Sequence, residues 1–363
     1  MNLHFEFLLY FLVNLTKAQE LQNLFIIFRH GETTPHHCYL TKPDMWKDGP
    51  DQLTEKGSKR LYSMGKFYRD QFPSFLSDNY THREFNVQSS NYDRALMSGQ
   101  LMAAGFYSKS QTPLPIPWRP VPVHSRKLEN DFIFANYDCK KFYKMIDEDY
   151  ETEDAKEYLS KYRDSLDKIN ENLSKKIAIQ DLRKLEDEII AMNIEKFPLP
   201  AWLTQTIIDA ISEICQHFRA LAYQGTERLI FEAGSFAKTY THHIEEWLKT
   251  GKILKPDLAA KHMMAFSGHD INIQSIMALF GVENIKLTDF GASLTIEIYG
   301  KKAPGSAKDY NVALKYKNDE TKDPKSLKMS FCNGEIICPL NILLEHLKKY
   351  AVSEEEYEEK CKL

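Results

Sequence analysis

Arginines, histidines and an aspartate follow apolar runs at three places in the sequence. The three segments are Phe28-Arg29-His30-Gly31, Ser89-Ser90-Asn91-Tyr92-Asp93-Arg94 and Phe266-Ser267-Gly268-His269-Asp270. The planar guanidinium of an arginine matches the oxygens of a phosphate group. A neutral histidine can act as a nucleophile, and an aspartic acid can protonate a leaving group. If these segments meet in the fold, their side chains could bind a phosphate and transfer it.

Each of these segments is expected to lie at the end of a strand. Residues 24–28 form a continuous apolar run of strand length, which is typical of a strand buried on both faces. Residues 85–90 and 262–267 are two further strand candidates. In open α/β sheets, ligands bind beyond the carboxyl ends of the strands, where the loops converge. The side chains expected to meet there are Arg29, His30, Arg94, His269 and Asp270.

Helical patterns separate the predicted strands. Thr54 is a predicted N-cap for a helix that runs to about Tyr68, and a second helix is expected from about Arg94 to Tyr107. Another helix follows the His-Asp pair, and Gly281 is its expected end. This alternation predicts an α/β fold, with a large domain in which helices flank a central mixed sheet.

The character of the sequence changes between about residues 140 and 250. This stretch is charge-dense and has helical spacing, which predicts a smaller, all-α cap domain inserted into the large domain. A coiled coil is the alternative, but strict heptads do not persist. The expected boundaries are 19–135 and 250–363 for the α/β core and 136–249 for the insertion.

The N-terminus is predicted to be a signal peptide, residues 1–18, because a short apolar run precedes small residues near Ala18. No later run is long enough for a transmembrane helix, so we expect a secreted, extracellular protein with no membrane partner. Asn79 and Asn172 lie in glycosylation triplets. The net charge of −4 indicates no nucleic-acid partner.

An even number of cysteines in a secreted chain favours disulfides, with buried free thiols as the alternative. The six are Cys38, Cys139, Cys215, Cys332, Cys338 and Cys361. Cys332 and Cys338 enclose a short turn that can bring them together. The absence of a Cys-x-x-Cys pair argues against a structural zinc site.

The site-bearing segments resemble the histidine acid phosphatases, whose signature is Arg-His-Gly-x-Arg-x-Pro with a distant His-Asp. The resemblance spans nearly the whole mature chain. The matching segments are "RHGETTP", "QLTEKGSKRLYSMG", "VQSSNYDRALMS", "PVPVHS", "FSGHDINI", "GASLTIEIY" and "CNGEIICPL". Together they imply the α/β fold with a helical cap.

The resemblance also implies a role for each site residue. His30 would attack phosphorus and form a phosphohistidine. Arg29, Arg94 and His269 would hold the phosphate oxygens. Asp270 would protonate the leaving alcohol and later assist water. No metal or organic cofactor is implied.

The resemblance further implies two disulfides, Cys332–Cys338 and Cys139–Cys361. It leaves Cys38 and Cys215 either bridged to each other or reduced. Family members often form homodimers, so a homodimer is compatible with the resemblance.

Part of the signature is altered. Thr33 stands where the signature has its second arginine, Glu32 falls at the variable position, and Pro35 matches. Asn91 and Ala95 also depart from the family pattern. One preorganised electrostatic donor is worth roughly 2.7 to 4 kcal/mol, or about 10² to 10³ in rate. We therefore weigh an impaired binding protein against a working secreted phosphatase that hydrolyses phosphomonoesters, and favour the binding protein.

With Thr33 in place of arginine, Glu32 and Asp270 are expected to contribute relatively more to the electrostatic field of the pocket. A cationic ligand then becomes less disfavoured. Four aromatic side chains of the insertion are expected either to wall the pocket or to pack in an ordinary core. They are Phe142, Tyr143, Trp202 and Phe218. The chain also resembles the salivary acid-phosphatase-like proteins of blood-feeding fleas, which implies sequestration of biogenic amines such as serotonin and of lipid mediators such as leukotrienes. A structural or partner-binding role is the third class considered.

Overall fold

The chain forms a mixed sheet, described here from a computed structural model. The described residues are 20–112, 114–116, 118–134, 139–174, 176–251, 262–318 and 320–362. The strands are β1 (Glu20–Arg29), β2 (Phe85–Ser89), β3 (Val123–Ser125), β4 (His262–Gly268), β5 (Ser293–Gly300), β6 (Tyr310–Lys317), β7 (Lys325–Ser326) and β8 (Ile337–Pro339). Their order is β3-β2-β4-β1-β5-β6-β7, and β8 pairs with β6. The strands β3, β2, β4 and β1 are parallel, and the others pair antiparallel.

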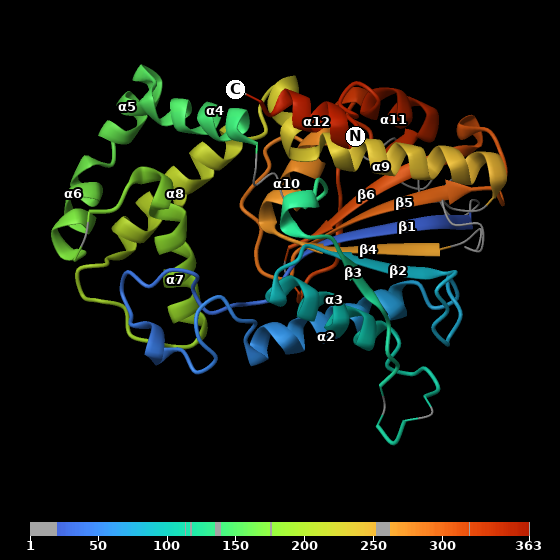
Figure 1. Cartoon of the computed structure of the whole chain (residues 1–363), viewed down its shortest axis with the longest axis horizontal. Coiled ribbons are helices and arrows are strands. Elements are labelled where there is room, and N and C mark those ends of the chain that lie inside the picture. Colours follow the sequence, from blue (N-terminus) through green and yellow to red (C-terminus); the bar gives the residue numbers. More distant parts are fainter. Residues whose placement is uncertain are drawn as a thin grey trace, which may run out of the picture.

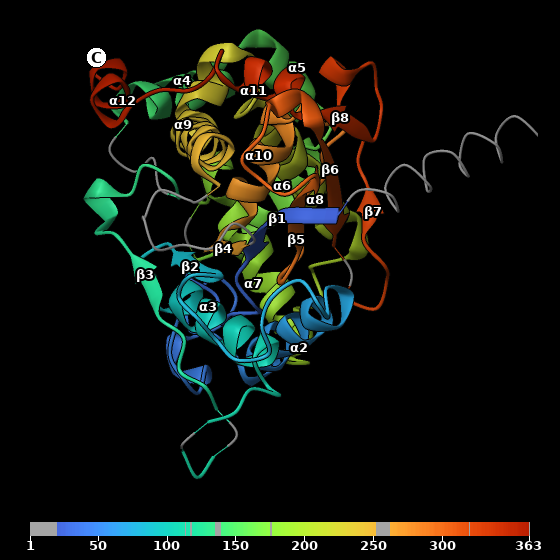
Figure 2. The ribbon, with the colours of Figure 1, turned by 90° about the vertical axis from the view of Figure 1, so that its right-hand side faces the viewer.

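Helices cover both faces of this sheet and also form a separate lobe beside it (Figure 1). They are α2 (Glu55–Gln71), α3 (Asp93–Phe106), α4 (Lys140–Glu151), α5 (Glu153–Ser160), α6 (Arg163–Asn172), α7 (Leu182–Ile194), α8 (Gln205–Leu221), α9 (Thr226–Thr250), α10 (Asp270–Leu279), α11 (Leu340–Leu347) and α12 (Glu354–Lys360). Figure 2 shows α2 and α3 on one side of the sheet and α9, α10 and α11 on the other. The predicted α/β class with a mixed sheet flanked by helices is confirmed.

Residues 24–28 of the central strand β1 are apolar without interruption because both faces of the strand are buried. Successive side chains of a strand point to opposite faces. Leu24 and Ile26 pack with α2 and α3, whereas Phe25 and Ile27 pack with α9, α10 and α11. Because helices cover both faces, residues 24–28 are apolar at every position. The predicted strand 24–28 lies inside β1.

The first long helix begins where the sequence predicts. The Thr54 side chain accepts a hydrogen bond from the Gly57 N–H, which satisfies one of the free donors at the start of α2. Leu61 and Tyr68 are among the buried residues of the face that α2 turns to the sheet. The cap therefore fixes the helix start at the end of the long segment that connects β1 to α2.

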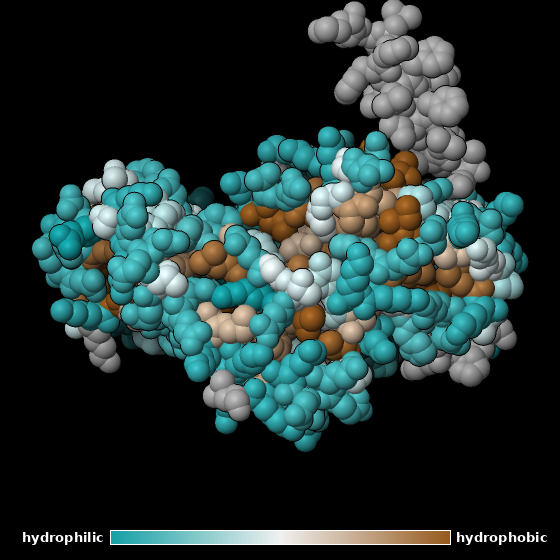
Figure 3. All heavy atoms as spheres, turned by 90° about the horizontal axis from the view of Figure 1, so that it is seen from above, coloured by the Kyte–Doolittle hydropathy of each residue, from teal (hydrophilic) through white to brown (hydrophobic). Residues whose placement is uncertain are grey.

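The helices α4–α8 form the lobe at the left of Figure 1, and they have a hydrophobic core of their own that includes Leu185 and Ile211. The outer surface of this lobe is mainly hydrophilic, whereas apolar patches appear on the upper surface of the main body (Figure 3). The helix α9 falls within the expected insertion 136–249, but its side chains pack on the sheet. The apolar face of α9 is turned to the sheet, and its side chains Phe236, Tyr240 and Trp247 belong to the same hydrophobic core as the strands.

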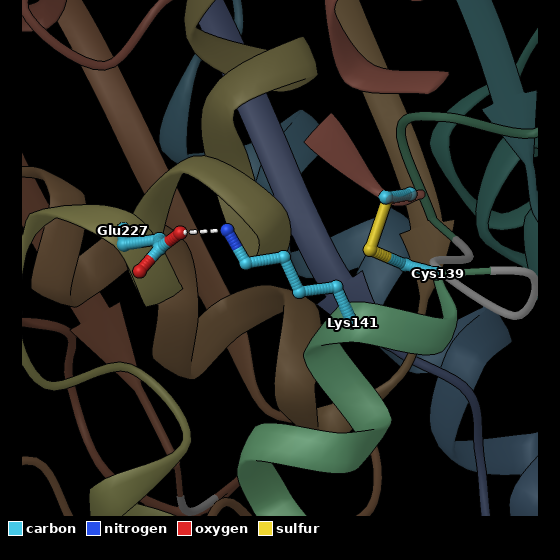
Figure 4. The surroundings of a disulfide bond; sticks show 4 residues. Cys139, Lys141 and Glu227 are labelled. Atoms are coloured by element: carbon cyan, nitrogen blue, oxygen red, sulfur yellow. Dashed lines mark hydrogen bonds and ion pairs between the residues drawn. A yellow bond between two sulfur atoms is a disulfide. The ribbon is translucent and has the colours of Figure 1, made fainter. Parts of the chain in front are cut away.

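Both disulfides that the resemblance implies are formed. Cys139 precedes α4 and bonds to Cys361 at the end of α12 (Figure 4). Cys332 bonds to Cys338 across a short turn. Cys38 and Cys215, whose pairing the sequence leaves open, are free thiols.

The predicted signal peptide, residues 1–18, lies outside the described residues. Within the described ranges, every helix is too short or too polar to cross a bilayer. Asn79 and Asn172, the predicted glycosylation sites, are both exposed. A glycan at either position therefore meets no buried surface, and glycosylation stays a prediction.

Candidate active site

The three segments that the sequence singles out meet at one edge of the sheet. Arg29 ends β1 and lies beside Gly268 at the end of β4. On the other side of β4, Ser89 at the end of β2 pairs with Ser267. The carboxyl ends of three parallel strands therefore bring the loops with the arginines, histidines and Asp270 together, in the position where open α/β sheets bind ligands.

The imidazole of His30 is buried and held by contacts on both nitrogens. Its Nδ1 lies 2.9 Å from the carbonyl oxygen of Gly31, so this nitrogen carries the proton. Its Nε2 accepts a hydrogen bond from Arg94 Nε at 3.2 Å. Burial, together with the positive charges of Arg29 and Arg94, holds the pKa of His30 well below its usual value. His30 is therefore neutral, with the Nε2 lone pair facing the arginine.

His269 lies beside it, with the two rings 5.4 Å apart. The Nε2 atom of His269 lies 2.9 Å from the Ser90 hydroxyl, and its backbone N–H donates to Asn272 Oδ1 in the first turn of α10. Burial and then Arg94 lower the pKa of His269 to about 3. This histidine too is neutral near pH 5, and it can offer a hydrogen bond but no charge.

Asp270 opens α10 and is paired with an arginine of the helical lobe. Arg183 on α7 donates from Nη2 to Asp270 Oδ2 at 2.9 Å. Burial alone would raise the pKa of Asp270, but the charges of Arg29 and Arg183 outweigh it and hold the pKa well below its usual range. Asp270 is therefore a carboxylate at acid pH. A general acid must carry a proton, so this pairing opposes the role that the resemblance implies.

The other arginines of the site also meet aspartates. Arg94 Nη1 donates to Asp51 Oδ2 at 2.5 Å. Arg29 donates to the Thr288 carbonyl at 2.7 Å, and its Nη2 lies 3.7 Å from Asp187 Oδ1. Both Arg183 and Asp187 come from α7, and the sequence showed only a charged helix there. Neither they nor Asp51 belong to a motif, so sequence reasoning missed them.

Thr33 borders the pocket as expected from its place in the signature. It forms an isolated bridge with Leu53 and is 8% exposed. Glu32 lies elsewhere, because its carboxylate accepts from Arg60 Nε at 2.9 Å and the residue is only 1% exposed. It lines neither of the cavities described below, so the expectation that Glu32 acts on a ligand is wrong.

Two cavities meet at this edge of the sheet. The smaller, about 200 Å³, lies against His30 and Thr33. The larger, about 480 Å³, lies between the sheet and the helical lobe. Five residues line both cavities, so the two cavities adjoin. They are Arg94, Arg183, Arg219, His269 and Asp270.

The larger cavity has an aromatic wall. Of the four aromatic side chains expected near the pocket, Phe142, Tyr143 and Phe218 line this cavity. Trp202 does not, because it packs against the core of the helical lobe. Glu232 of α9 adds a buried carboxylate to the wall. At the sheet edge the two cavities are thus lined by cationic side chains. Toward the lobe the lining is mainly apolar and includes the carboxylate of Glu232.

This fold and the strand-end cluster of arginines and neutral histidines define a class of protein built like a phosphate-binding α/β enzyme. A family model of the histidine phosphatase superfamily, branch 2, matches residues 33–330. The match covers most of the chain, so the chain belongs to this superfamily and is an acid-phosphatase-like protein.

Acid phosphatases of vertebrates are similar to the chain along most of its length. Mouse prostatic acid phosphatase is 26% identical over 362 residues, which cover 96% of this chain and 91% of the relative. Lysosomal acid phosphatase of Xenopus laevis is 23% identical over 370 residues, with 98% and 82% covered.

Solved structures agree with the fold. The Hafnia alvei phytase in its apo form superposes with a TM-score of 0.66 at 15% identity, covering 95% of this chain and 98% of the phytase. The same phytase in complex with tartrate gives 0.67 at 16% identity, with 95% and 99% covered. At this identity the likeness concerns the fold alone.

Proposed function

We propose that this chain is a secreted acid-phosphatase-like protein that binds and sequesters small amphipathic mediators in the two adjoining cavities, and that its phosphatase chemistry is impaired. In this proposal residues 1–18 are a cleaved signal peptide and residues 136–249 supply the cap over the site. The observation that carries the proposal is the pairing of Asp270 with Arg183. Together with Thr33 in place of an arginine, it leaves the site short of both a phosphate clamp and a protonated acid.

The larger cavity supports amines as one class of ligand. An aromatic amine such as serotonin needs a carboxylate for its ammonium group and apolar surface for its ring. Glu232 supplies a buried carboxylate, and Phe142 and Phe218 supply aromatic surface in the same cavity. Aromatic faces also attract cations, which adds to the carboxylate.

The junction of the cavities supports acidic lipids as a second class. Arg183 and Arg219 line both cavities, so they lie between the cationic pocket and the apolar wall. A leukotriene would place a carboxylate against these guanidinium groups and its chain along the aromatic side chains. Such binding is also what the resemblance to salivary acid-phosphatase-like proteins implies.

Calorimetric titration with serotonin and with a leukotriene tests the proposal. Glu232→Gln should weaken serotonin binding by about tenfold or more and leave the leukotriene affected little, while Arg219→Gln should do the reverse. Glu227→Gln is the matched control, because Glu227 lies on the same helix but points to Lys141 at the surface (Figure 4). If neither ligand gives binding heat, the proposal fails.

A second function, hydrolysis of phosphomonoesters through a phosphohistidine, is favoured by His30. Its Nδ1 is held by Gly31, so Nε2 is the unprotonated nitrogen of a neutral imidazole, as a nucleophile requires once the hydrogen bond from Arg94 Nε is released. Ordinary turnover of an aryl phosphate at pH 5 by the purified natural protein, lost in His30→Ala, would establish this function in place of sequestration.

A further inference from the structure

Two arginines of the smaller cavity, Arg29 and Arg94, are approached by carboxylates that do not come from the catalytic motifs. Arg94 is hydrogen-bonded to Asp51, which lies in the loop that rims the pocket. Asp187 reaches the pocket from α7, with its Oδ1 3.7 Å from Arg29 Nη2 and 3.2 Å from Arg183 Nη2. Both aspartates line the same cavity as His30. Two aspartate side chains thus face the space that a phosphate group would enter.

Asp51 and Asp187 come from different elements, but each places a carboxylate next to an arginine of the pocket. Asp51 is held with a positive φ of 62° and its side chain is turned to Arg94, and His36 Nδ1 lies 3.6 Å from the same oxygen, Oδ2, that accepts the hydrogen bond from Arg94. Asp187 stands one helical turn after Arg183, so α7 delivers an arginine and an aspartate together. An incoming anion must either displace the carboxylate that is already paired with a guanidinium or bind next to it against its charge. Either course penalises a dianion more than a monoanion, a zwitterion or a cation.

We propose that Asp51 and Asp187 are specificity-determining residues, which neutralise Arg94 and Arg29 and so select against phosphomonoester dianions in the pocket beside His30. This inference rests on the proposed function, because it concerns the ligand charge of the same site. It adds a second cause of weak phosphate binding, independent of Thr33: Arg29 and Arg94 are already engaged by acidic partners.

The test is the affinity of the purified chain for inorganic phosphate, measured by calorimetric titration. Asp51→Asn and Asp187→Asn remove a charge and keep the shape, and asparagine tolerates a positive φ at least as well as aspartate. Each variant should bind phosphate on the order of tenfold to a hundredfold more tightly than the natural chain. The gain should shrink at high salt, because it is electrostatic. Asp164→Asn, an exposed residue of α6, is the matched control and should change nothing.

The outcomes separate this inference from the proposed function. Tighter phosphate binding in the folded variants supports the inference even if the natural chain binds neither amines nor leukotrienes. Unchanged phosphate affinity in Asp51→Asn and Asp187→Asn overturns it, even if those mediators bind well. Circular dichroism confirms the fold of each variant, and because the two residues lie in different elements, either variant alone decides the matter if the other does not fold.

Discussion

Restoring the missing arginine is the sharpest perturbation of this site. Thr33 lies at the wall of the smaller cavity, beside His30, and its side chain makes no large contribution to the core. An arginine at this position extends into a space of about 200 Å³. Asp51 lines the same cavity and can balance part of the added charge. Thr33→Arg therefore adds one guanidinium where the phosphate oxygens would lie.

The expected gain follows from the worth of a single preorganised donor. Such a donor contributes roughly 2.7 to 4 kcal/mol to the transition state, or about 10² to 10³ in rate. The general acid remains a separate obstacle, because Arg183 still holds Asp270 as a carboxylate. Proton transfer by a positioned acid is worth about 10² to 10⁴, so Thr33→Arg alone should not reach full activity.

The assay is the hydrolysis of p-nitrophenyl phosphate at pH 5, followed as kcat/KM. His36→Arg is the matched control, because it adds a guanidinium at the pocket rim, where the His36 side chain is 66% exposed. The control should gain little, since a solvated charge acts weakly on a bound anion. If Thr33→Arg gains less than about threefold, or no more than His36→Arg, the reasoning that a missing clamp limits this site is refuted.

Three further predictions concern the site and its support. In the Thr33→Arg background, adding Arg183→Gln should raise the pKa of Asp270 and shift the alkaline limb of the pH–rate profile upward, because a general acid loses its proton as the pH rises through its pKa; an unmoved profile would contradict the pairing. Because the folded-state pKa of His269 is lowered to about 3 while the unfolded value is near 6.5, its contribution to stability is complete above pH 6.5 and is lost as the pH falls toward 3. Urea unfolding should therefore show a loss of about 2 kcal/mol from this group between pH 7 and 5, with a slope that approaches about 1.4 kcal/mol per pH unit only below about pH 5.5, and His269→Gln should flatten that slope. Cys361→Ser, which opens the bridge between α4 and the C-terminus, should lower the unfolding free energy by about 2 to 5 kcal/mol; an unchanged thermal midpoint would count against that role.

The elements of the core were readable from the sequence because their signals are local. The apolar run of β1, the cap at Thr54 and the stop at Gly281 each depend on neighbours a few residues away. The alternation of strands and helices then restricts the sheet to few arrangements, and the ends of its parallel strands must converge. The meeting of the motif residues at one edge followed from that rule.

The partners of those residues were decided by tertiary structure. Arg183 and Asp187 look like any charged residues of a solvated helix, and only the docking of the lobe on the sheet turns them toward Asp270 and Arg29. Glu32 shows the converse, since its place in the motif suggested a ligand contact while Arg60, far along the chain, captures its carboxylate. Two charged side chains interact when they lie within several ångströms of each other in space, whatever their separation in sequence. The spacing of residues in the sequence therefore does not predict which charges will pair.

The sequence by itself therefore determined the class of fold, the two disulfides through the family resemblance, and the altered clamp at Thr33. Only the tertiary structure decided the charge balance of the pocket, because that balance depends on which aspartate faces which arginine after two separately packed bodies of the chain have met. Burial then magnifies each of these pairings, since water no longer screens them.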